Sequence, residues 1–139
     1  MSAAERRPLH VLVVDDHLAS VEALVRLLRH EGCEAFQASN VAQAMRIAQS
    51  RRLDVLVADI TLPDGDGREL LRRVSALHPR VRGIAVTGHA GIEYEDTCRR
   101  AGYERMFTKP LLFAQLLVEL FPVFTPGRAE GAGAPIAII

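Results

Sequence analysis

The chain is poor in lysine, in cysteine and in long apolar runs, and each shortage excludes a class of protein. All but one of its 17 basic residues are arginine, and 17 acidic residues bring the net charge to zero. Without a basic excess or a basic stripe with aromatics, the sequence gives no sign of direct nucleic-acid binding. The two cysteines, Cys33 and Cys98, are far apart and lack partners at metal-ligand spacing. We therefore expect neither a disulfide framework nor a zinc site.

No apolar run is long enough for a signal peptide or a membrane-spanning helix. Reduced thiols and the absence of such segments favour a cytoplasmic protein. The 139 residues suffice for one domain, and 49% apolar residues are enough for a packed core. We expect residues 1–8 to be disordered, residues 9–121 to fold, and the Gly-, Ala- and Pro-rich residues 122–139 to form a flexible tail.

Strand-like and helix-like segments alternate five times along the folded part. The short apolar runs predict strands at 9–14, 34–38, 53–58, 81–86 and 104–108. Helical periodicity predicts helices at 18–31, about 41–49, 67–77, 92–101 and 111–121. Leu18, Leu77 and Ile92 are expected to face the core. Short connections and strands buried on both faces indicate an α/β fold with a parallel sheet and helices on both sides.

Polar residues follow four of these strands where each strand ends. Asp15 and Asp16 follow the first strand, Asp59 the third, Thr87 the fourth, and the only lysine, Lys109, the fifth. Parallel strands bring these positions to one edge of the sheet, where α/β proteins bind ligands. Three neighbouring carboxylates repel one another unless a cation such as Mg²⁺ neutralises them. An aspartate beside Mg²⁺ can attack a phosphoryl group, and an ammonium and a hydroxyl can stabilise its oxygens.

Each of these residues taken alone has an ordinary structural explanation. Asp16 could cap the following helix, Thr87 could be a turn hydroxyl, and Lys109 could be a solvated charge. The conjunction is more specific, because four separate strand ends each supply one member of the same chemical set.

At these residues the chain resembles the receiver domains of two-component response regulators, over roughly residues 9–121. The motifs are Val13-Val14-Asp15-Asp16, Asp59-Ile60-Thr61-Leu62-Pro63 with Asp66-Gly67, Val86-Thr87-Gly88, and Phe107-Thr108-Lys109-Pro110. The resemblance implies a flavodoxin-like (βα)₅ doubly wound parallel sheet with strand order 2-1-3-4-5. It also implies that Asp59 accepts a phosphoryl group from a histidine kinase or a phosphotransfer domain.

The same resemblance implies roles for the remaining site residues. Mg²⁺ would be bound by Asp15, Asp16, Asp59 and the backbone carbonyl of Thr61. Thr87 and Lys109 would contact the phosphoryl group and couple it to a change of shape. His89, two residues past Thr87, and Thr61 itself would tune hydrolysis of the phosphoryl group.

Two positions depart from the family pattern. The switch position three residues before the lysine usually holds an aromatic ring, and here it is Met106, with Phe107 expected on the opposite face. The last helix is almost entirely apolar, so we expect an exposed apolar patch on it. That patch predicts a homodimer or an output partner on the face made by the fourth helix, the fifth strand and the fifth helix. Alternatively, Ile136, Ile138 and Ile139 of the tail cover it.

Three functions compete at this point. The first is a phosphoacceptor switch, which is not an enzyme beyond self-phosphorylation and autodephosphorylation. The second is a receiver-like interaction module that works without phosphorylation, for which Met106 leaves room. The third is an Asp-nucleophile phosphohydrolase, which lacks an acid/base aspartate at Thr61. The 18 residues after Phe121 are too few for an effector domain. We therefore expect a single-domain regulator or part of a larger protein. The Thr87-Gly88 pair and the Leu-Pro-Asp-Gly-Asp-Gly loop at 62–67 resemble those of hybrid histidine kinase receivers, which favours that origin.

Overall fold

The computed structural model describes residues 7–88 and 91–121. Their main feature is a five-stranded parallel sheet of β1 (His10–Val14), β2 (Glu34–Ala38), β3 (Val55–Ala58), β6 (Arg82–Thr87) and β7 (Tyr103–Thr108). The helices are α1 (Leu18–His30), α2 (Val41–Ser50), α3 (Gly67–Leu77), α4 (Ile92–Arg100) and α5 (Phe113–Leu120). A short hairpin, β4 (Thr61–Leu62) and β5 (Gly65–Asp66), lies between β3 and α3. The predicted disordered end and flexible tail lie outside the described residues, apart from residues 7 and 8.

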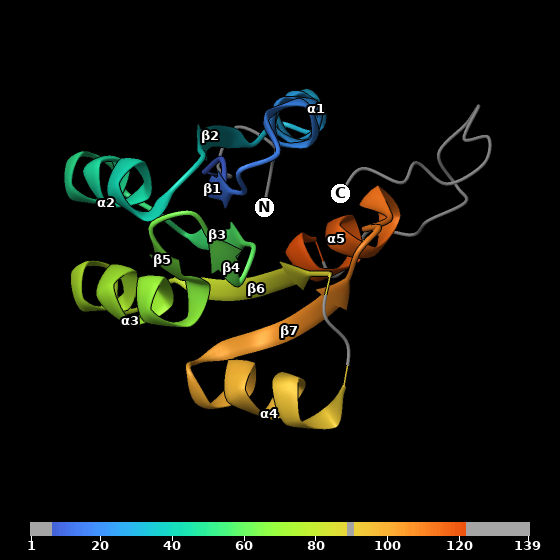
Figure 1. Cartoon of the computed structure of the whole chain (residues 1–139). Helices are drawn as coiled ribbons and strands as arrows, with labels where there is room; N and C mark the ends of the chain where they lie inside the picture. The colour runs from blue at the N-terminus through green and yellow to red at the C-terminus, as the bar shows by residue number, and fades with distance from the viewer. Residues whose placement is uncertain (1–6, 89–90, 122–139) are drawn as a thin grey trace.

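The sheet order is β2-β1-β3-β6-β7, which confirms the predicted 2-1-3-4-5 arrangement once β6 and β7 are counted as the fourth and fifth strands. Helices α1 and α5 cover one face of the sheet, and α2, α3 and α4 cover the other (Figure 1). Neighbouring residues of one strand alternate between the two layers: Val11 and Val13 pack with α1 and α5, while Leu12 and Val14 pack with α2 and α3. The strands are therefore buried on both sides, as their continuous apolar runs indicated.

An irregularity in β7 decides which side chains face α4. Tyr103 pairs with Gly83, but the next pair is Arg105 with Ile84, so Glu104 is an extra residue in the ladder. The bulge places Tyr103 and Met106 in the layer of α3 and α4, while Phe107 packs in the layer of α1 and α5. The expected opposition of Met106 and Phe107 is confirmed.

Three apolar residues expected in the core are exposed instead. Leu18 is 57% exposed, Leu77 46% and Ile92 87%. Leu18 and Ile92 are the first residues of their helices and Leu77 is the last of its own. A helix end that extends past the edge of the sheet has no surface to pack against, so helical periodicity overestimates burial there.

The exposed apolar patch expected on the last helix is not found among its described residues. Leu111, Phe113 and Leu117 join Leu116 and Leu120 in the core cluster that contains the α1 side chains. Of the large apolar residues described in this helix, only Val118 counts as exposed, at 38%. The cluster shared with α1 widens the buried stripe of the helix beyond what one sheet face could cover. The tail isoleucines of the alternative explanation lie outside the described residues.

None of the helices in the described ranges has the length and apolar character needed to cross a bilayer.

Candidate functional site

The polar residues that follow the strands meet at one edge of the sheet, as the sequence predicted. The register pairs Val14 with Ala58 and Thr87 with Thr108, so the residues that follow these strands are neighbours in space. Backbone hydrogen bonds continue past the strand ends: the Asp59 amide donates to the Val14 carbonyl at 2.9 Å, and the Lys109 amide donates to the Thr87 carbonyl at 2.7 Å. The positions of Asp59 and Lys109 are therefore fixed by the sheet itself.

Lys109 joins two of the carboxylates. Its ammonium nitrogen lies 2.9 Å from Oδ2 of Asp59, to which it donates a hydrogen bond, and 2.9 Å from Oδ2 of Asp15. The second contact is an ion pair with an oxygen that is buried. Burial by itself would lower the pKa of Lys109, but the two carboxylates outweigh it and raise that pKa above its ordinary value. The lysine therefore stays charged at neutral pH.

The other oxygens of the two carboxylates are held by backbone amides. Oδ1 of Asp15 accepts from the His17 amide at 2.9 Å, and Oδ1 of Asp59 accepts from the Thr61 amide at 3.1 Å. Asp15 is 1% exposed and Asp59 is 8% exposed. Each carboxylate is thus oriented by one amide and one ammonium, which leaves little freedom for rotation.

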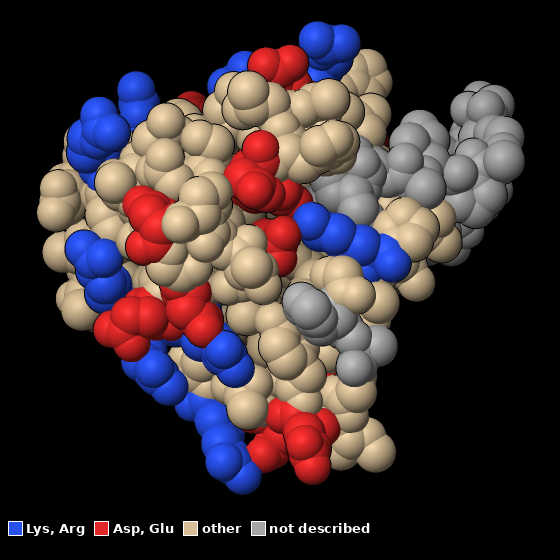
Figure 2. All heavy atoms as spheres, in the orientation of Figure 1, with Lys and Arg blue, Asp and Glu red and all other residues tan. Residues whose placement is uncertain are grey.

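The three aspartates fit a small divalent cation. Asp15, Asp16 and Asp59 each offer one carboxylate oxygen, and these oxygens lie within 4.8 Å of one another. Oδ2 of Asp15 is buried, and the Lys109 ammonium at 2.9 Å is the positive charge that faces it. Figure 2 shows acidic side chains gathered near the middle of the face in view, next to a basic one. An all-oxygen set of this kind suits a hard cation.

The hairpin after Asp59 was not predicted from the sequence, although its Pro63-Asp64-Gly65 turn is a hairpin signal. Thr61 pairs with Asp66 across it. At its tip, the Asp64 carboxylate accepts from the Val41 amide at 2.7 Å and the Ala42 amide at 3.0 Å, at the start of α2. The Val41 hydrogen bond is the main cause that lowers the pKa of Asp64. The segment that carries Thr61 is therefore anchored to α2.

Gly67 lets the start of α3 approach the backbone of Asp59. A Cβ atom added at Gly67 would lie 2.8 Å from the Cα of Ile60 and even closer to the Asp59 carbonyl oxygen. The Gly67 amide donates to the Ile60 carbonyl at 2.7 Å, and the Tyr103 hydroxyl donates to the Gly67 carbonyl at 2.7 Å. Asp66 caps the helix, since its Oδ1 accepts from the Arg68 amide at 2.7 Å.

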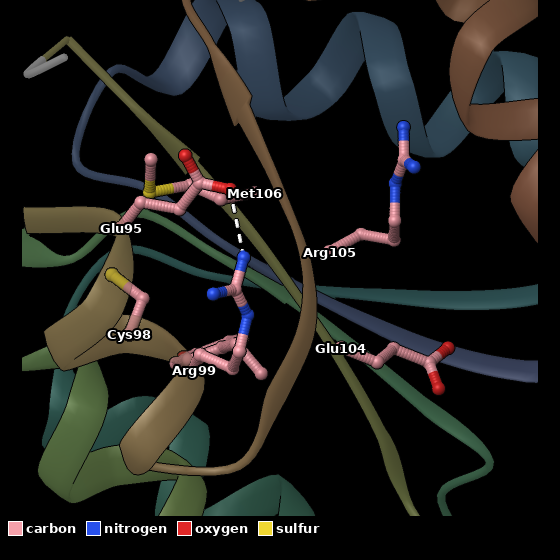
Figure 3. A pocket seen from close by; sticks show the side chains of 7 residues that line it. Glu95, Cys98, Arg99, Glu104, Arg105 and Met106 are labelled. Carbon is pink, nitrogen blue, oxygen red and sulfur yellow. Dashed lines mark hydrogen bonds and ion pairs between the residues drawn. The ribbon is translucent and has the colours of Figure 1, made fainter. Parts of the chain in front are cut away.

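The two predicted switch residues lie on neighbouring strands. Thr87 is fully buried at the end of β6, and Met106 is partly buried in β7, where it pairs with Ala85. Met106 lines a pocket of about 240 Å³ between α4 and β7, and Figure 3 shows Arg105 pointing to the other side of the strand. The backbone joins Thr87 to Lys109, since the Lys109 amide donates to the Thr87 carbonyl at 2.7 Å. His89 lies outside the described residues.

Comparisons with known proteins agree with this geometry. Residues 11–121 match the family model of the response regulator receiver domain. Sporulation initiation phosphotransferase F of Bacillus subtilis is 30% identical over 100 residues, which cover 72% of this chain and 81% of that protein. The chain spans about half the length of other curated relatives that it matches.

Solved structures give the same answer for the fold. A CheY-like receiver domain protein from Methanospirillum hungatei superposes with a TM-score of 0.77 at 29% identity, covering 82% of this chain and 91% of that one. A response regulator from Burkholderia pseudomallei, solved with a phosphorylated aspartic acid, a calcium ion and citrate, gives 0.75 at 25% identity, covering 79% and 65%. With its flavodoxin-like sheet and a family match over residues 11–121, the chain belongs to the response regulator receiver domains.

Proposed function

We propose that this domain is a phosphoacceptor switch, in which Asp59 takes a phosphoryl group from a histidine kinase or a phosphotransfer protein. The observation that carries the proposal is the placement of Asp59 at the sheet edge, bonded to Lys109 and grouped with Asp15 and Asp16. One nucleophilic carboxylate, one ammonium and two further carboxylates are the parts that phosphoryl transfer to aspartate requires. The phosphorylated aspartate of the Burkholderia pseudomallei neighbour supports the same chemistry.

The proposed transfer moves one phosphoryl group from the donor to Asp59, and the electron pair of the broken bond stays with the donor. An oxygen of the ionised Asp59 carboxylate attacks the phosphorus, and a new P–O bond forms. The bond between phosphorus and the donor atom breaks, and its electron pair leaves with the donor, which is a histidine nitrogen in a phosphohistidine. Lys109, which lies 2.9 Å from Asp59 Oδ2, is placed to stabilise negative charge on the phosphoryl oxygens in transit.

Asp15, Asp16 and Asp59, with the backbone carbonyl of Thr61, are the residues that would hold Mg²⁺. The bound ion supplies neutralisation of the carboxylates and Lewis acidity toward phosphoryl oxygens. The chain's own residues supply the orientation: the His17 and Thr61 amides fix Asp15 and Asp59, and the hairpin fixes Thr61. Thr87 and Lys109 complete the proposed phosphoryl contacts.

The test of this proposal is phosphorylation by acetyl phosphate with Mg²⁺, followed by intact-mass measurement. We expect the mass of one phosphoryl group on the wild type and none on Asp59→Asn. Asp96→Asn is the matched control, because its carboxylate pairs with Arg100 on the surface of α4 and should leave labelling unchanged. Labelling of Asp59→Asn at the wild-type level would refute the assignment. An unlabelled but folded wild type would favour the phosphorylation-independent interaction module.

Asp16→Asn is expected to weaken the response to Mg²⁺ while leaving the fold intact. Asp16 is exposed, unlike Asp15 and Asp59, so its loss should change the metal-free melting temperature little. A ligand at 100 times its dissociation constant stabilises a protein by about 2.7 kcal/mol, and tenfold weaker binding removes about 1.4 kcal/mol of that. Melting curves over a Mg²⁺ titration measure the difference. Identical Mg²⁺ responses in the two proteins would remove Asp16 from the metal site.

The proposed output surface is the face of α4, β7 and α5, which would bind a partner domain or a second copy. Its described side chains are mainly charged rather than apolar. Arg105 pairs with Glu119 at 3.1 Å, and Arg99 pairs with Glu95 at 3.0 Å. A partner on this face would therefore be recognised through charge and hydrogen bonding, since the apolar patch expected from the sequence is buried.

A further inference from the structure

Arg68 connects the start of α3 with α4. Its guanidinium makes a forked contact with Asp66, with Nε 3.0 Å from Oδ1 and Nη2 2.6 Å from Oδ2. Its remaining nitrogen, Nη1, donates to Oγ1 of Thr97 at 2.8 Å. The guanidinium carbon also lies 5.6 Å from the centre of the Tyr94 ring. One side chain thus joins a residue of the hairpin to two residues of α4.

The α4 end of this link is well defined. The Thr97 hydroxyl donates to the Tyr94 carbonyl at 2.7 Å, which leaves its oxygen to accept from Arg68. Arg68 and Asp66 stabilise each other's charged forms, so the Arg68 guanidinium lowers the pKa of Asp66. Two hydrogen bonds to one carboxylate fix the plane of a guanidinium, and its third arm then points in a defined direction.

The other end of the link leads directly to the phosphoacceptor. Asp66 pairs with Thr61, the residue proposed to offer its carbonyl to Mg²⁺. The next residue, Gly67, packs against the backbone of Asp59 and Ile60 so closely that no side chain fits between them. A displacement of the Asp59 loop therefore has to move Asp66 and Gly67 with it, and with them the fork that orients Arg68.

Among the described helices, α4 is the one that a displacement of Arg68 would move most easily. Cys98 is its only buried residue, whereas each of the other described helices has at least four buried residues. Below it lies the pocket of about 240 Å³ lined by Glu95, Arg99 and Met106 (Figure 3). Over α3 and α4, basic and acidic side chains share the surface in Figure 2. A helix with few buried residues shifts at low cost, so the contacts of Arg68 with Thr97 and Tyr94 can influence its position.

We propose that Arg68 is a positioning residue that transmits phosphorylation of Asp59 to helix α4 through Asp66 and Thr97. The proposal rests on the function proposed above and adds the route by which the site reaches the output face. This route runs through α3 and is separate from the one through Thr87 and Met106. Met106 has no aromatic ring that could move between two packed positions. Its side chain is flexible and fills space in many conformations. The Arg68 contacts offer a second connection to α4 that does not depend on Met106.

The experiment compares hydrogen exchange of the α4 backbone amides before and after phosphorylation with acetyl phosphate and Mg²⁺. Intact mass gives the extent of phosphorylation in the same samples. We expect α4 exchange in the wild type to change by roughly fivefold or more. In Arg68→Gln and in Thr97→Val we expect the same phosphorylation but less than about a twofold change. Because each variant is compared with its own unphosphorylated form, an effect of the substitution that is equal in both states cancels.

Two further variants sharpen the test. Arg72→Gln is the matched control, because Arg72 also lies on α3 but pairs with Glu69 on the surface at 3.1 Å, and its α4 response should equal that of the wild type. The double variant of Arg68→Gln and Thr97→Val should respond like either single variant, because both remove one contact.

Three outcomes would overturn the proposal. A full α4 response in phosphorylated Arg68→Gln, or no α4 response in phosphorylated wild type, overturns the coupling alone. A wild type that takes no phosphoryl group overturns the proposed function, and the coupling with it.

Discussion

Replacing Gly67 with alanine is expected to lower the melting temperature by about 10 °C, from a loss of roughly 3 kcal/mol in the free energy of unfolding. The new methyl group would lie 2.8 Å from the Cα of Ile60 and closer still to the carbonyl oxygen of Asp59. Both are backbone atoms in the segment that joins β3 to the hairpin, so no side chain can rotate away to make room. Either α3 or the phosphoacceptor loop has to move.

Gly88→Ala is the matched control for this substitution. Gly88 also lies at the sheet edge, immediately after Thr87, but a Cβ atom added there meets nothing within 4 Å. Its φ angle is not positive, so alanine can adopt the same backbone conformation, and its melting temperature should stay level or rise slightly. Thermal unfolding by circular dichroism measures both variants. If Gly67→Ala melts with the wild type, the close approach of α3 to Asp59 is not a constraint on this fold.

The parallel sheet and the polar residues at its edge could be predicted because both follow from order along the chain. An apolar run that ends in a polar residue marks a buried strand and the place where it stops. Parallel pairing then brings Asp15, Asp59 and Lys109 to the same edge without any knowledge of side-chain packing. The ion pairs of Lys109 with both aspartates are the direct consequence.

What could not be predicted depends on contacts between distant residues. The Arg68 to Thr97 hydrogen bond spans 29 positions and the Tyr103 to Gly67 bond spans 36, and neither spacing has a signature in the sequence. The bulge at Glu104 changes which residues of β7 face α4, and strict alternation cannot foresee it. The burial of the last helix depends on its sharing a core cluster with α1.

Lys109→Gln is expected to lower the free energy of unfolding by about 2 kcal/mol in metal-free buffer. The substitution leaves Asp15, which is 1% exposed, and Asp59 without the ammonium that now bridges them. A buried carboxylate that loses its charged partner pays the full cost of its desolvation. The Lys109 side chain is 27% exposed, so water can partly replace the ammonium, and the loss stays below that of a deeply buried pair.

Mg²⁺ should reverse this loss, because a divalent cation at the three aspartates takes over the neutralisation that Lys109 provides. In the wild type the ion has to share Asp15 and Asp59 with the ammonium, whereas in Lys109→Gln it does not. The rise in melting temperature on adding Mg²⁺ is therefore expected to be larger in the variant than in the wild type. Arg99→Gln, which removes a cation from an exposed pair on α4, should show the wild-type response.

Lys109→Arg separates the charge of this residue from its shape. Arginine keeps the positive charge, so the variant should fold and remain close to the wild type in metal-free stability. Its guanidinium is broad and forked, and it cannot replace a compact ammonium beside a phosphoryl group on Asp59, from which the Lys109 nitrogen now lies 2.9 Å. We therefore expect phosphorylation of Lys109→Arg to change α4 hydrogen exchange less than phosphorylation of the wild type does, with the part transmitted through Arg68 retained. A Mg²⁺ response of Lys109→Gln smaller than that of the wild type would show that the lysine and the ion do not compete for the same oxygens.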